Sequence, residues 1–565
     1  MKYRYYSCTR LNDIRQIVKR SSGLYAGRIA FKELDRDKNV IKYTYEQLEH
    51  DMDALGTALL ELGFAGYHVA LLGENSYAWV VSYLAVVNGV GVAVPLDKEL
   101  PGADVAKLLR KSDADAVICS QTYAPVIESI LGECQNIKAC IVMGEARPGF
   151  LSMGELIAKG EGLLQAGDQS YLDKPIDATA LCEIIFTSGT TGANKGVMLS
   201  HHNIASVVYG MLQQIRANPV SLSVLPVSHS YECTCHVLGG IYSGCTLCFN
   251  DSLKHVMDNM RLFKPGMSLM VPLFLETMHR QIWKEAEKAN LAGHLRYGIA
   301  LSNVLRKVGI DLRRLYFKPV LEKFGGELRQ IVCGGAPLRA ELIKAFDDLG
   351  INVVNGYGIT ECAPVISTNC TAWKKLDSVG RVLPVCHVRI GEPDAYGNGE
   401  VLVKGDIVML GYYHDEESTR ASFTEDGYFK TGDLGRVDRR GFLYLNGRKK
   451  NLIVLSNGKN VCPEEIEEEV LGKIPYVSEI VVYSRAACAG IESIHADVYL
   501  DQEFAKSCTP ASVWEKLNGD ILRLNSRLPP YKRIQSFKIS ETEFEKTTTR
   551  KIKRHAVLKG GESLA

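Results

Sequence analysis

The sequence lacks the features that would assign a chain of this length to a membrane, secreted or nucleic-acid-binding class. Its 565 residues contain no uninterrupted apolar run long enough to span a bilayer. Residues 1–10 lack the apolar segment of a secretory signal, and we find no internal repeat. Lysine and arginine together number 66 and aspartate and glutamate 65, so no positive excess favours a nucleic-acid partner. These absences predict a cytoplasmic, globular protein.

The 16 cysteines do not form a pattern typical of disulfides or zinc sites. They are scattered, and several, such as Cys182 and Cys333, stand in apolar runs, which indicates reduced thiols in a cytoplasmic protein. The densest group lacks two CxxC-type pairs and lies in a stretch typical of buried helix and strand, so we predict no zinc site there. That group consists of Cys233, Cys235, His236, Cys245 and Cys248.

The chain length implies more than one domain, and the hydrophobic pattern alternates between helical and strand-like segments. Helical spacing covers residues 45–62 and 79–87, and short buried-strand patterns cover residues 69–72 and 91–95. Ser200 is placed to cap a further helix. Alternation of this kind predicts an α/β fold with layered, largely parallel, doubly wound sheets.

A polar and basic segment at residues 284–323 interrupts this alternation. It has helical spacing and many cations, and its simplest interpretation is a solvated helical insertion. The alternative is a surface that meets anionic lipid or a protein partner. The cations include Arg296, Arg306, Lys307, Arg313, Arg314 and Lys318.

The composition changes again near Gly447, where a charged joint at residues 448–451 follows a strand-like segment. Beyond the joint the pattern predicts a helix that begins at Pro463, because proline suits the first helical turn and the glutamates that follow complement the helix dipole. We therefore predict a large N-terminal domain at residues 1–448 and a small α+β domain at residues 449–565.

A loop rich in hydroxyl and glycine residues joins two strand-like segments on either side of residues 187–196. Glycines let backbone N–H groups crowd around an anion, and Lys195 adds a positive charge, so the loop predicts a phosphate cradle. Lys195 precedes Gly196, whereas the P-loop of kinases and GTPases requires glycine, lysine and then serine or threonine. The density of these residues disfavours the alternative of a flexible surface loop. The predicted cradle consists of Thr187, Ser188, Gly189, Thr190, Thr191, Gly192 and Lys195.

Three further clusters combine residue types that bind nucleotides, although each alone has a simpler structural interpretation. In the first, Tyr357 could stack on a base, Thr360 could donate to a phosphate and Glu361 could bind a hard cation; a packed turn is the simpler interpretation. In the second, Asp433 follows a glycine at a strand end, where it could accept both hydroxyls of a ribose or simply close a turn. The third, residues 546–554, is by composition a solvated basic tail.

The order and spacing of these motifs resemble the adenylate-forming superfamily, which includes acyl-CoA synthetases, nonribosomal peptide adenylation domains and luciferases. The resemblance covers nearly the whole chain. The sequence at residues 456–467 and the helical insertion are similar to the long-chain fatty acid–CoA ligase branch. The motifs that carry the resemblance lie, in order, at residues 187–196, 334–337, 356–361, 431–433, 447–448, 458–467 and 546–551.

This resemblance implies an enzyme that binds ATP and Mg²⁺ and uses CoA as a co-substrate. In that family the carboxylate of a fatty acid attacks the α-phosphorus of ATP, pyrophosphate leaves, and a thiol then attacks the acyl-adenylate. The phosphate cradle would hold the departing β- and γ-phosphates, Glu361 would bind Mg²⁺, and Thr360 would contact the α-phosphate. The adenosine would contact Gly335, Ala336, Tyr357 and Gly358 at its base and Asp433 and Arg448 at its ribose.

Two lysines and a histidine complete the implied machinery. Lys551 would reach the α-phosphate and the incoming carboxylate, where an ammonium group suits the negative charge of the transition state. The family rotates its small domain between the two steps about a hinge that matches Lys450, in agreement with the charged joint. His229 matches a position that closes the acid site; the alternative role is that of a structural histidine.

The chain departs from the family pattern at three places without losing a reacting group. Arg550 stands where glycine is usual, Glu545 where proline is usual, and Asn451 where an acid is common. Two other functions stay open: a ligase that loads acyl groups onto the phosphopantetheine of an acyl carrier protein, and a non-catalytic protein that binds nucleotide or lipid. The position of Lys195 disfavours a kinase or NTPase. Peripheral membrane contact, acyl length and oligomeric state also stay open.

Overall fold

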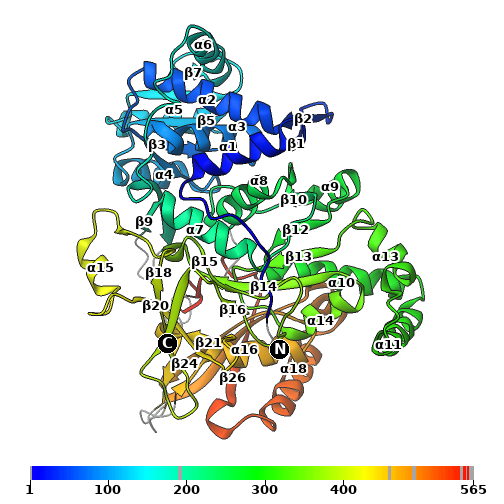
Figure 1. The fold of residues 1–565 in the computed structure, drawn as a ribbon. Helices are drawn as coiled ribbons and strands as arrows, with labels where there is room; N and C mark the ends of the chain where they lie inside the picture. The colour runs from blue at the N-terminus through cyan, green and yellow to red at the C-terminus, as the bar shows by residue number, and fades with distance from the viewer. Residues whose placement is uncertain are drawn as a thin grey trace. The chain divides into compact units, whose positions relative to one another are not determined.

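A computed structural model describes the protein at residues 3–188, 194–455, 460–486, 492–546, 552–554 and 556–558 (Figure 1). The chain divides into two compact units. Unit 1 contains Met1–Val388 and Val403–Phe429, and unit 2 contains Arg389–Leu402 and Lys430–Ala565. Within the described ranges, every helix is too short or too polar to cross a membrane.

An eight-stranded sheet in unit 1 has parallel strands at its centre. Its order is β19 (Gly411–Tyr412), β9 (Asn194–Ser200), β8 (Leu181–Ser188), β4 (Val92–Pro95), β3 (His68–Leu72), β5 (Ala116–Ser120), β6 (Ala139–Met143) and β7 (Leu151–Ser152). Strand β3 pairs in parallel with β4 and β5, as expected where helices connect successive strands. Strands β8 and β9 instead form an antiparallel hairpin, which frames the predicted phosphate loop.

A nine-stranded sheet in the same unit repeats this plan. Its order is β16 (Arg381–Val382), β15 (Val365–Thr368), β14 (Asn352–Gly358), β13 (Gln330–Cys333), β12 (Met267–Met270), β10 (Val220–Ser223), β11 (Thr246–Phe249), β1 (Ile29–Leu34) and β2 (Val40–Thr44). The strands from β11 to β14 pair in parallel, and antiparallel pairs close both edges. The prediction of an α/β fold with largely parallel sheets is confirmed.

Helices connect these strands and begin where the sequence provides caps. Helix α3 (Tyr77–Ala85) begins after Ser76, whose hydroxyl accepts the Trp79 N–H. Helix α7 (His201–Leu212) begins after Ser200 with a capping box, as predicted. The other long helices of unit 1 are α1 (Ile14–Tyr25), α2 (Tyr45–Glu61), α4 (Gly102–Lys111), α5 (Ala124–Ile130), α6 (Met153–Gln165), α9 (Val256–Phe263), α10 (Pro272–Lys288), α11 (Ala292–Lys307) and α14 (Ala340–Asp348).

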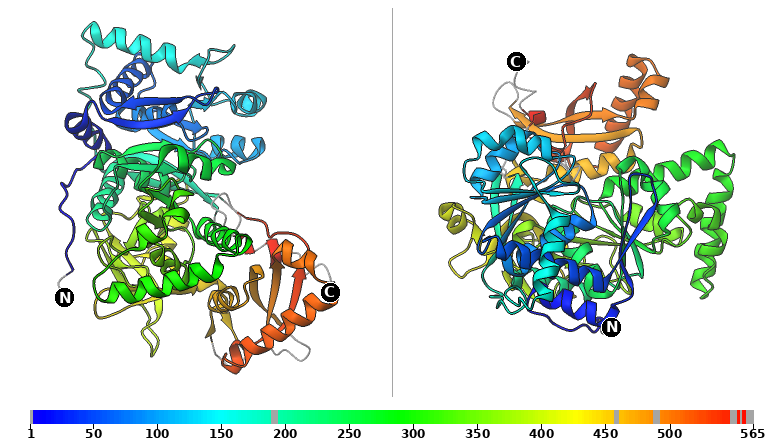
Figure 2. Two further views of the ribbon diagram at one scale, coloured as in Figure 1. Left: turned by 90° about the vertical axis from the view of Figure 1, so that its right-hand side faces the viewer. Right: turned by 90° about the horizontal axis from the view of Figure 1, so that it is seen from above.

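The basic segment at residues 284–323 is helical, as predicted. It contains the end of α10, then α11, α12 (Arg313–Tyr316) and α13 (Lys318–Glu322). Two further views show α11 as a long helix that projects at the margin of unit 1 (Figure 2). Ion pairs connect the segment to α14, since Arg306 Nη2 lies 2.9 Å from Asp347 Oδ2.

The cysteine-rich stretch is part of the core of unit 1. Cys233, Cys235 and His236 lie in the π-helical turn η3 (Tyr231–Leu238), and Cys245 and Cys248 lie just beyond α8 (Gly239–Ser243), all buried. The His236 Nδ1 atom is 2.7 Å from Glu232 Oε1, and its Nε2 atom contacts the Ser221 hydroxyl. These groups therefore form a buried polar network within the core.

Unit 2 contains an α+β core in its C-terminal part. Val482, Val498 and Leu517 are among the side chains that α16, the three-stranded sheet and α18 bury together. The elements are α16 (Pro463–Lys473), β24 (Val477–Ala486), β25 (Glu492–Leu500), α17 (Gln502–Ser507), α18 (Pro510–Asn525) and β26 (Ile534–Ser540). Helix α16 begins at Pro463, as predicted, with Glu464 and Glu465 in its first turn.

A four-stranded sheet contains residues from both sides of the points at which the chain passes from one unit to the other. Its order is β17 (Cys386–Gly391), β18 (Gly399–Gly405), β20 (Phe429–Val437) and β21 (Leu443–Arg448). Residues 430–448 group with unit 2, where Asn446 on β21 donates to Glu465 Oε1 on α16 over 3.4 Å. The domain boundary predicted at residues 448/449 stays a prediction.

Candidate functional site

The β8–β9 hairpin presents both ends of the predicted phosphate loop side by side. Thr187 is the register partner of Lys195, and Ser188 is the partner of Asn194. Four predicted loop residues, Gly189, Thr190, Thr191 and Gly192, lie outside the described residues. The hairpin brings the two ends of the loop together, the geometry expected of a compact anion-binding turn.

Lys195 is held on β9 by two contacts. Its Nζ atom lies 2.8 Å from the Ser418 hydroxyl oxygen and 4.7 Å from the centre of the Tyr412 ring. The first contact is a hydrogen bond, and the second places the ammonium over an aromatic face. Both partners come from residues 403–429, whose strand β19 pairs with β9.

Tyr412 also contacts the residue predicted to bind the metal ion. Its hydroxyl donates to Glu361 Oε1 over 2.9 Å, so one tyrosine links Lys195 to Glu361. Burial, together with the neighbouring Glu361, raises the pKa of Tyr412 above its usual value. The hydroxyl therefore stays protonated and available as a donor at neutral pH.

Glu361 lies in a turn whose backbone requires glycine nearby. It belongs to the short helix η5 (Thr360–Cys362), and the Met409 N–H donates to its carbonyl oxygen over 2.9 Å. A Cβ atom added at Gly358 would lie 1.8 Å from the Pro364 carbonyl oxygen. A side chain at that position would displace the turn that carries Thr360, which is buried, and Glu361, which is half-buried.

The segment predicted to contact the adenine base follows β13. Gly335 has a φ of +84° and is exposed together with Ala336. The Tyr231 ring packs against Gly334, and its hydroxyl donates to the Val332 carbonyl over 3.1 Å. Tyr357, on the neighbouring strand β14, is half-buried. These contacts hold the exposed glycine turn at the end of the parallel strands, where open α/β sheets bind ligands.

His229 belongs to the turn that contains Tyr231. The Nδ1 atom of its ring accepts the Tyr231 backbone N–H over 3.1 Å, and the backbone N–H of His229 donates to the Pro226 carbonyl over 3.0 Å. Since Nδ1 accepts a hydrogen bond, the neutral ring carries its proton on Nε2. Tyr231 thus connects the predicted acid-site histidine to the predicted adenine segment.

Within unit 2, the two residues predicted to hold the ribose form an ion pair. Arg448 Nε lies 2.8 Å from Asp433 Oδ1, because the two residues are register partners on β20 and β21. The Asp433 carboxylate is almost fully buried, and its backbone N–H donates to the Thr431 hydroxyl. The pair is pre-organised, with a buried acceptor and a half-exposed guanidinium.

The predicted hinge lies in the turn η6 (Lys449–Asn451). Burial and the neighbouring cations Arg448 and Arg554 lower the pKa of Lys450. Asn451, which departs from the family pattern, donates to Glu464 Oε1 in the first turn of α16 over 2.5 Å. The joint is therefore tied to the small α+β core by a neutral amide.

Lys551 lies outside the described residues, but the segments on both sides of it are described. Lys546 and Ile552 form an antiparallel bridge, and Lys546 pairs with Glu479. Arg554 Nη1 lies 2.7 Å from Glu467 Oε1, and Glu545, another departure, pairs with Lys553. Both ends of the segment that carries Lys551 are thus anchored within unit 2.

A small apolar cavity lies beside η3 in unit 1. Its volume is about 20 Å³, and its walls include Met211, Met267, Cys235 and His236. The buried Glu232 carboxylate bonds to His236 from the other side. The cavity is therefore apolar except for one imidazole edge.

Comparisons with known proteins identify the family of this chain. The family model described as AMP-binding enzyme matches residues 18–413, and the model described as AMP-binding enzyme C-terminal domain matches residues 450–561. The chain belongs to the AMP-binding family of adenylate-forming enzymes. The resemblance predicted from the motifs is confirmed, and ATP binding is a property of this family.

Individual relatives extend over most of the chain. Long-chain-fatty-acid–CoA ligase FadD15 of Mycobacterium bovis is 26% identical over 552 residues, covering 91% of this chain and 90% of the relative. Peroxisomal long chain acyl-CoA synthetase 7 of Arabidopsis thaliana is 30% identical over 492 residues, covering 81% of this chain and 69% of the relative. The structure of the anthranilate CoA ligase AuaEII with anthranoyl-AMP matches with a TM-score of 0.78 at 21% identity, covering 100% of this chain and 99% of that one. The chain falls within the AMP-forming acid–thiol ligases.

Two residues of the cluster around Lys195 are missing from the sequence-based prediction. Tyr412 and Ser418 lie more than 200 positions after Lys195, in a segment that contains none of the motifs of the family resemblance. A glycine followed by two tyrosines at residues 411–413 is the available signal of a close-packed turn. Nothing in that pattern places the turn beside β9.

Proposed function

We propose that this protein activates a long-chain fatty acid with ATP and then transfers the acyl group to CoA. In the first step the carboxylate attacks the α-phosphorus, which gives acyl-AMP and pyrophosphate. In the second step the CoA thiol attacks the acyl carbon, and AMP leaves. The observation that carries this proposal is the cluster in which Tyr412 links Lys195 to Glu361 beside the β8–β9 hairpin. The names of the relatives support a long-chain acid as the substrate.

Lys195 and the loop before it bind the β- and γ-phosphates. The Ser418 hydroxyl and the Tyr412 ring keep the lysine ammonium at the end of the hairpin. A compact positive charge at this point stabilises pyrophosphate as it leaves. The backbone and hydroxyl groups of Thr187, Ser188, Gly189, Thr190, Thr191 and Gly192 supply the other donors.

Glu361 is the residue that we assign to Mg²⁺. A carboxylate oxygen is the donor that this ion prefers, and a half-buried side chain suits an ion that keeps its remaining ligands among water and phosphate oxygens. When bound, Mg²⁺ neutralises phosphate charge. Tyr412 donates to Oε1 and so orients the carboxylate, while Thr360, next in the chain, contacts the α-phosphate.

The adenosine part of ATP is assigned to two groups of residues. Asp433 accepts from the ribose hydroxyls, and the Arg448 guanidinium orients that carboxylate. Tyr357 stacks on the base. The backbone of Gly335, Ala336 and Gly358 approaches the nucleotide closely, which residues without bulky side chains permit.

Lys551 and Lys450 are assigned separate roles in the C-terminal region. Lys551 supplies positive charge to the α-phosphate and the incoming carboxylate in the first step. Lys450 is the hinge about which the C-terminal region reorients for the second step. The anchoring of Lys546 and Arg554 supports this proposal, because it carries the Lys551 segment along with the α+β core.

The cavity beside η3 is our candidate for the acyl chain, with His229 closing the acid site. Its volume of about 20 Å³ is close to the room that a single water needs, so a long acyl chain requires wall side chains to move. Met211 and Met267 are suited to this, because methionine side chains are flexible. Chain length is then decided by how far these walls open.

ATP–pyrophosphate exchange with carboxylic acids of graded length tests the proposal. We expect exchange that rises with chain length, followed by AMP release when CoA is added. Production of ADP in place of AMP and pyrophosphate would overturn the activation step. Rapid thioester formation with a holo acyl carrier protein, together with none with CoA, would overturn the choice of acceptor.

A further inference from the structure

Helix α11 has an apolar stripe on its outer face. Tyr297, Leu301, Val304 and Val308 follow one another at spacings of four, three and four residues, which places them on one side of the helix. Their exposed fractions are 67%, 41%, 59% and 71%. Of the 24 large apolar side chains that are exposed in the described residues, nine fall within residues 291–316. The insertion therefore concentrates exposed apolar surface.

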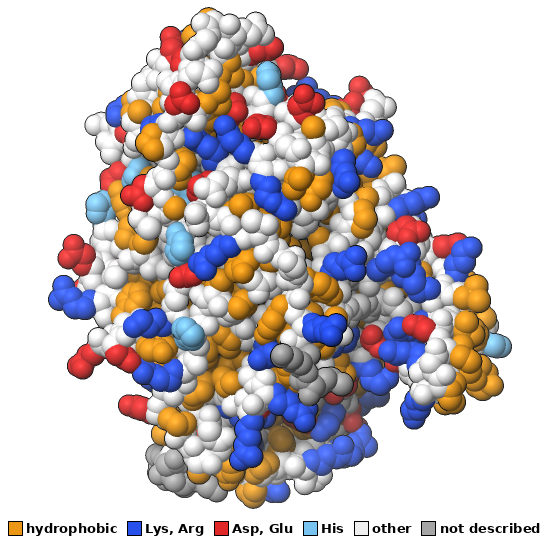
Figure 3. Space-filling view, viewed as in Figure 1, with side chains coloured by type: hydrophobic (Ala, Val, Ile, Leu, Met, Phe, Trp, Pro, Cys, Tyr) orange, Lys and Arg blue, Asp and Glu red, His pale blue; other side chains and the backbone are white. Residues whose placement is uncertain are grey.

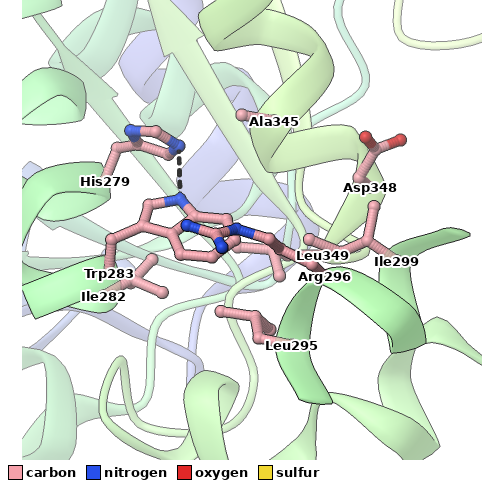
Figure 4. A pocket seen from close by; sticks show the side chains of 9 residues that line it. All are labelled: His279, Ile282, Trp283, Leu295, Arg296, Ile299, Ala345, Asp348 and Leu349. Carbon is pink, nitrogen blue, oxygen red and sulfur yellow. Dashed lines mark hydrogen bonds between the residues drawn. The ribbon is translucent and has the colours of Figure 1, made fainter. Parts of the chain in front are cut away.

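The opposite face of α11 already has its packing partners. Leu295 and Ile299 line a cavity of about 310 Å³ together with His279 and Trp283, and Figure 4 shows these side chains around it. The Trp283 indole N–H donates to His279 Nε2 over 2.9 Å. Arg306, also on the inner side, pairs with Asp347 on α14. The inner face therefore attaches the helix to unit 1, and the outer stripe is left exposed.

The charges around the stripe are mostly positive. No acidic residue occurs between Lys288 and Ile310, whereas Lys288 and Lys307 are exposed in that stretch, and Asp311, which follows it, pairs with Arg313. Figure 3 shows hydrophobic side chains gathered over this part of the molecule, with Lys and Arg side chains next to them. Apolar side chains beside an excess of cations form the pattern of helices that lie in the surface of an anionic bilayer.

We propose that α11 and the following residues 308–316 dock the protein on an anionic phospholipid bilayer. The apolar stripe enters the boundary between headgroups and acyl chains, and the cations at its side contact lipid phosphates. The surface projects from unit 1 as a convex helix (Figures 1 and 2), which suits a soft bilayer better than a partner helix that needs a groove. This proposal does not depend on the reaction assigned to the protein.

Vesicle flotation with the full chain tests the docking surface. We expect binding to phosphatidylcholine vesicles that contain about 30% phosphatidylglycerol, and binding at least about tenfold weaker to phosphatidylcholine alone. The double variant Val304→Glu/Val308→Glu should bind the anionic vesicles at least about tenfold more weakly than the wild type. The variant Lys288→Glu/Lys307→Glu should weaken binding to the anionic vesicles and leave the weak binding to neutral vesicles unchanged.

A matched pair of tyrosine variants serves as the control. Tyr297→Glu should reduce vesicle binding, whereas Tyr396→Glu, at a side chain that is 85% exposed in unit 2, should bind as the wild type does. Thermal unfolding of each variant, and exchange with a short water-soluble acid, should remain unchanged. Wild-type binding by Val304→Glu/Val308→Glu would overturn the proposal. A wild-type dimer that this variant converts to a monomer, without vesicle binding by either, would also overturn it.

Discussion

The predicted phosphate site of unit 1 and the predicted ribose pair of unit 2 are assembled in different ways. Lys195 and Ser418 are 223 positions apart and meet because β19 joins the edge of the eight-stranded sheet. Asp433 and Arg448 instead face each other across one hairpin. The first arrangement depends on the tertiary fold, and the second on local strand register. A change at a contact between distant segments should therefore disturb the first arrangement more than the second.

The largest effect is expected for Lys551→Ala, in a segment whose ends are anchored within unit 2. Removal of the ammonium that we assign to the α-phosphate should lower adenylation by about a hundredfold to a thousandfold. Thioester formation from supplied acyl-adenylate should be largely retained. Pyrophosphate release and thioester formation are measured separately for this purpose.

Lys553→Ala is the matched control for this prediction. Lys553 lies two positions away and pairs with Glu545, so its loss removes a surface contact and no assigned reacting group. We expect near wild-type rates in both steps. Unchanged pyrophosphate release in Lys551→Ala would contradict the role assigned to that lysine.

Tyr412→Ala tests the contact between distant segments in unit 1. It removes both the ring beneath Lys195 and the hydroxyl that donates to Glu361, and should lower kcat/KM for ATP by roughly a hundredfold. Tyr412→Phe keeps the ring, and its kcat/KM for ATP should be roughly tenfold lower than that of the wild type. Tyr413→Phe, which loses a hydrogen bond to Asp113 instead, should be close to the wild type. Equal activity of Tyr412→Ala and Tyr413→Phe would show that the link has no catalytic effect.

Asp433→Asn tests the local pair in unit 2. The substitution keeps the shape of the side chain but removes the charge that faces Arg448, and should raise KM for ATP by roughly tenfold. With the wild-type enzyme, an ATP analogue that lacks the ribose hydroxyls should show a KM raised by a similar factor. If Asp433 binds those hydroxyls, the two losses should not add when variant and analogue are combined. Full additivity would argue against ribose contact.

The smallest expected effects concern stability. One buried glutamate in each unit allows the two units to be compared. Burial raises the pKa of Glu183, on β8, to about 8, and its Oε1 atom has no hydrogen-bond partner within the described residues. Since its folded pKa lies above the unfolded value, its stabilising contribution is complete below the unfolded pKa and is lost as pH rises toward the folded pKa. Glu183→Gln should therefore stabilise unit 1 at about pH 8, by on the order of 3 kcal/mol, and much less at about pH 5.

Glu467 in unit 2 should respond in the same direction, but more weakly. Burial raises its pKa to about 7 while Arg554 opposes that rise, and the two side chains form an ion pair. Because the raised pKa makes the ionised form less favourable in the folded state, Glu467→Gln should gain stability relative to the wild type as pH rises from about 5 to about 8. The gain should be smaller than for Glu183→Gln, because the variant also removes the charged partner of Arg554. Unfolding followed at about pH 5 and about pH 8 measures both variants. A destabilised Glu183→Gln at the higher pH would contradict the account given for β8.

The sequence predicted local features well, because their causes are local. Pro463 and the glutamates after it predicted the start of α16, and Ser200 predicted the start of α7. The two strands on either side of the phosphate loop followed from two short apolar runs that flank hydroxyls and glycines. In each case neighbouring residues satisfy one another's backbone groups, so a few positions contain the whole signal.

The contacts made by Tyr412 and Ser418 could not be predicted in the same way. Their residue types are common, and their positions beside Lys195 depend on a two-residue strand at the edge of a sheet. The grouping of residues 430–448 with the C-terminal part also depends on tertiary contacts, such as that between Asn446 on β21 and Glu465 on α16. Such contacts arise from the tertiary arrangement of strands and helices, which short-range patterns do not encode.

The sequence by itself determined the α/β class, the family and the residue types available for phosphate and ribose. The tertiary structure decided which of these side chains meet and which surfaces stay uncovered. It placed Tyr412 between Lys195 and Glu361, and it left the outer stripe of α11 without a packing partner among the described residues. The physical reason is that motifs arise from chemistry within a few residues, whereas contacts and exposed faces arise from packing across the whole sheet.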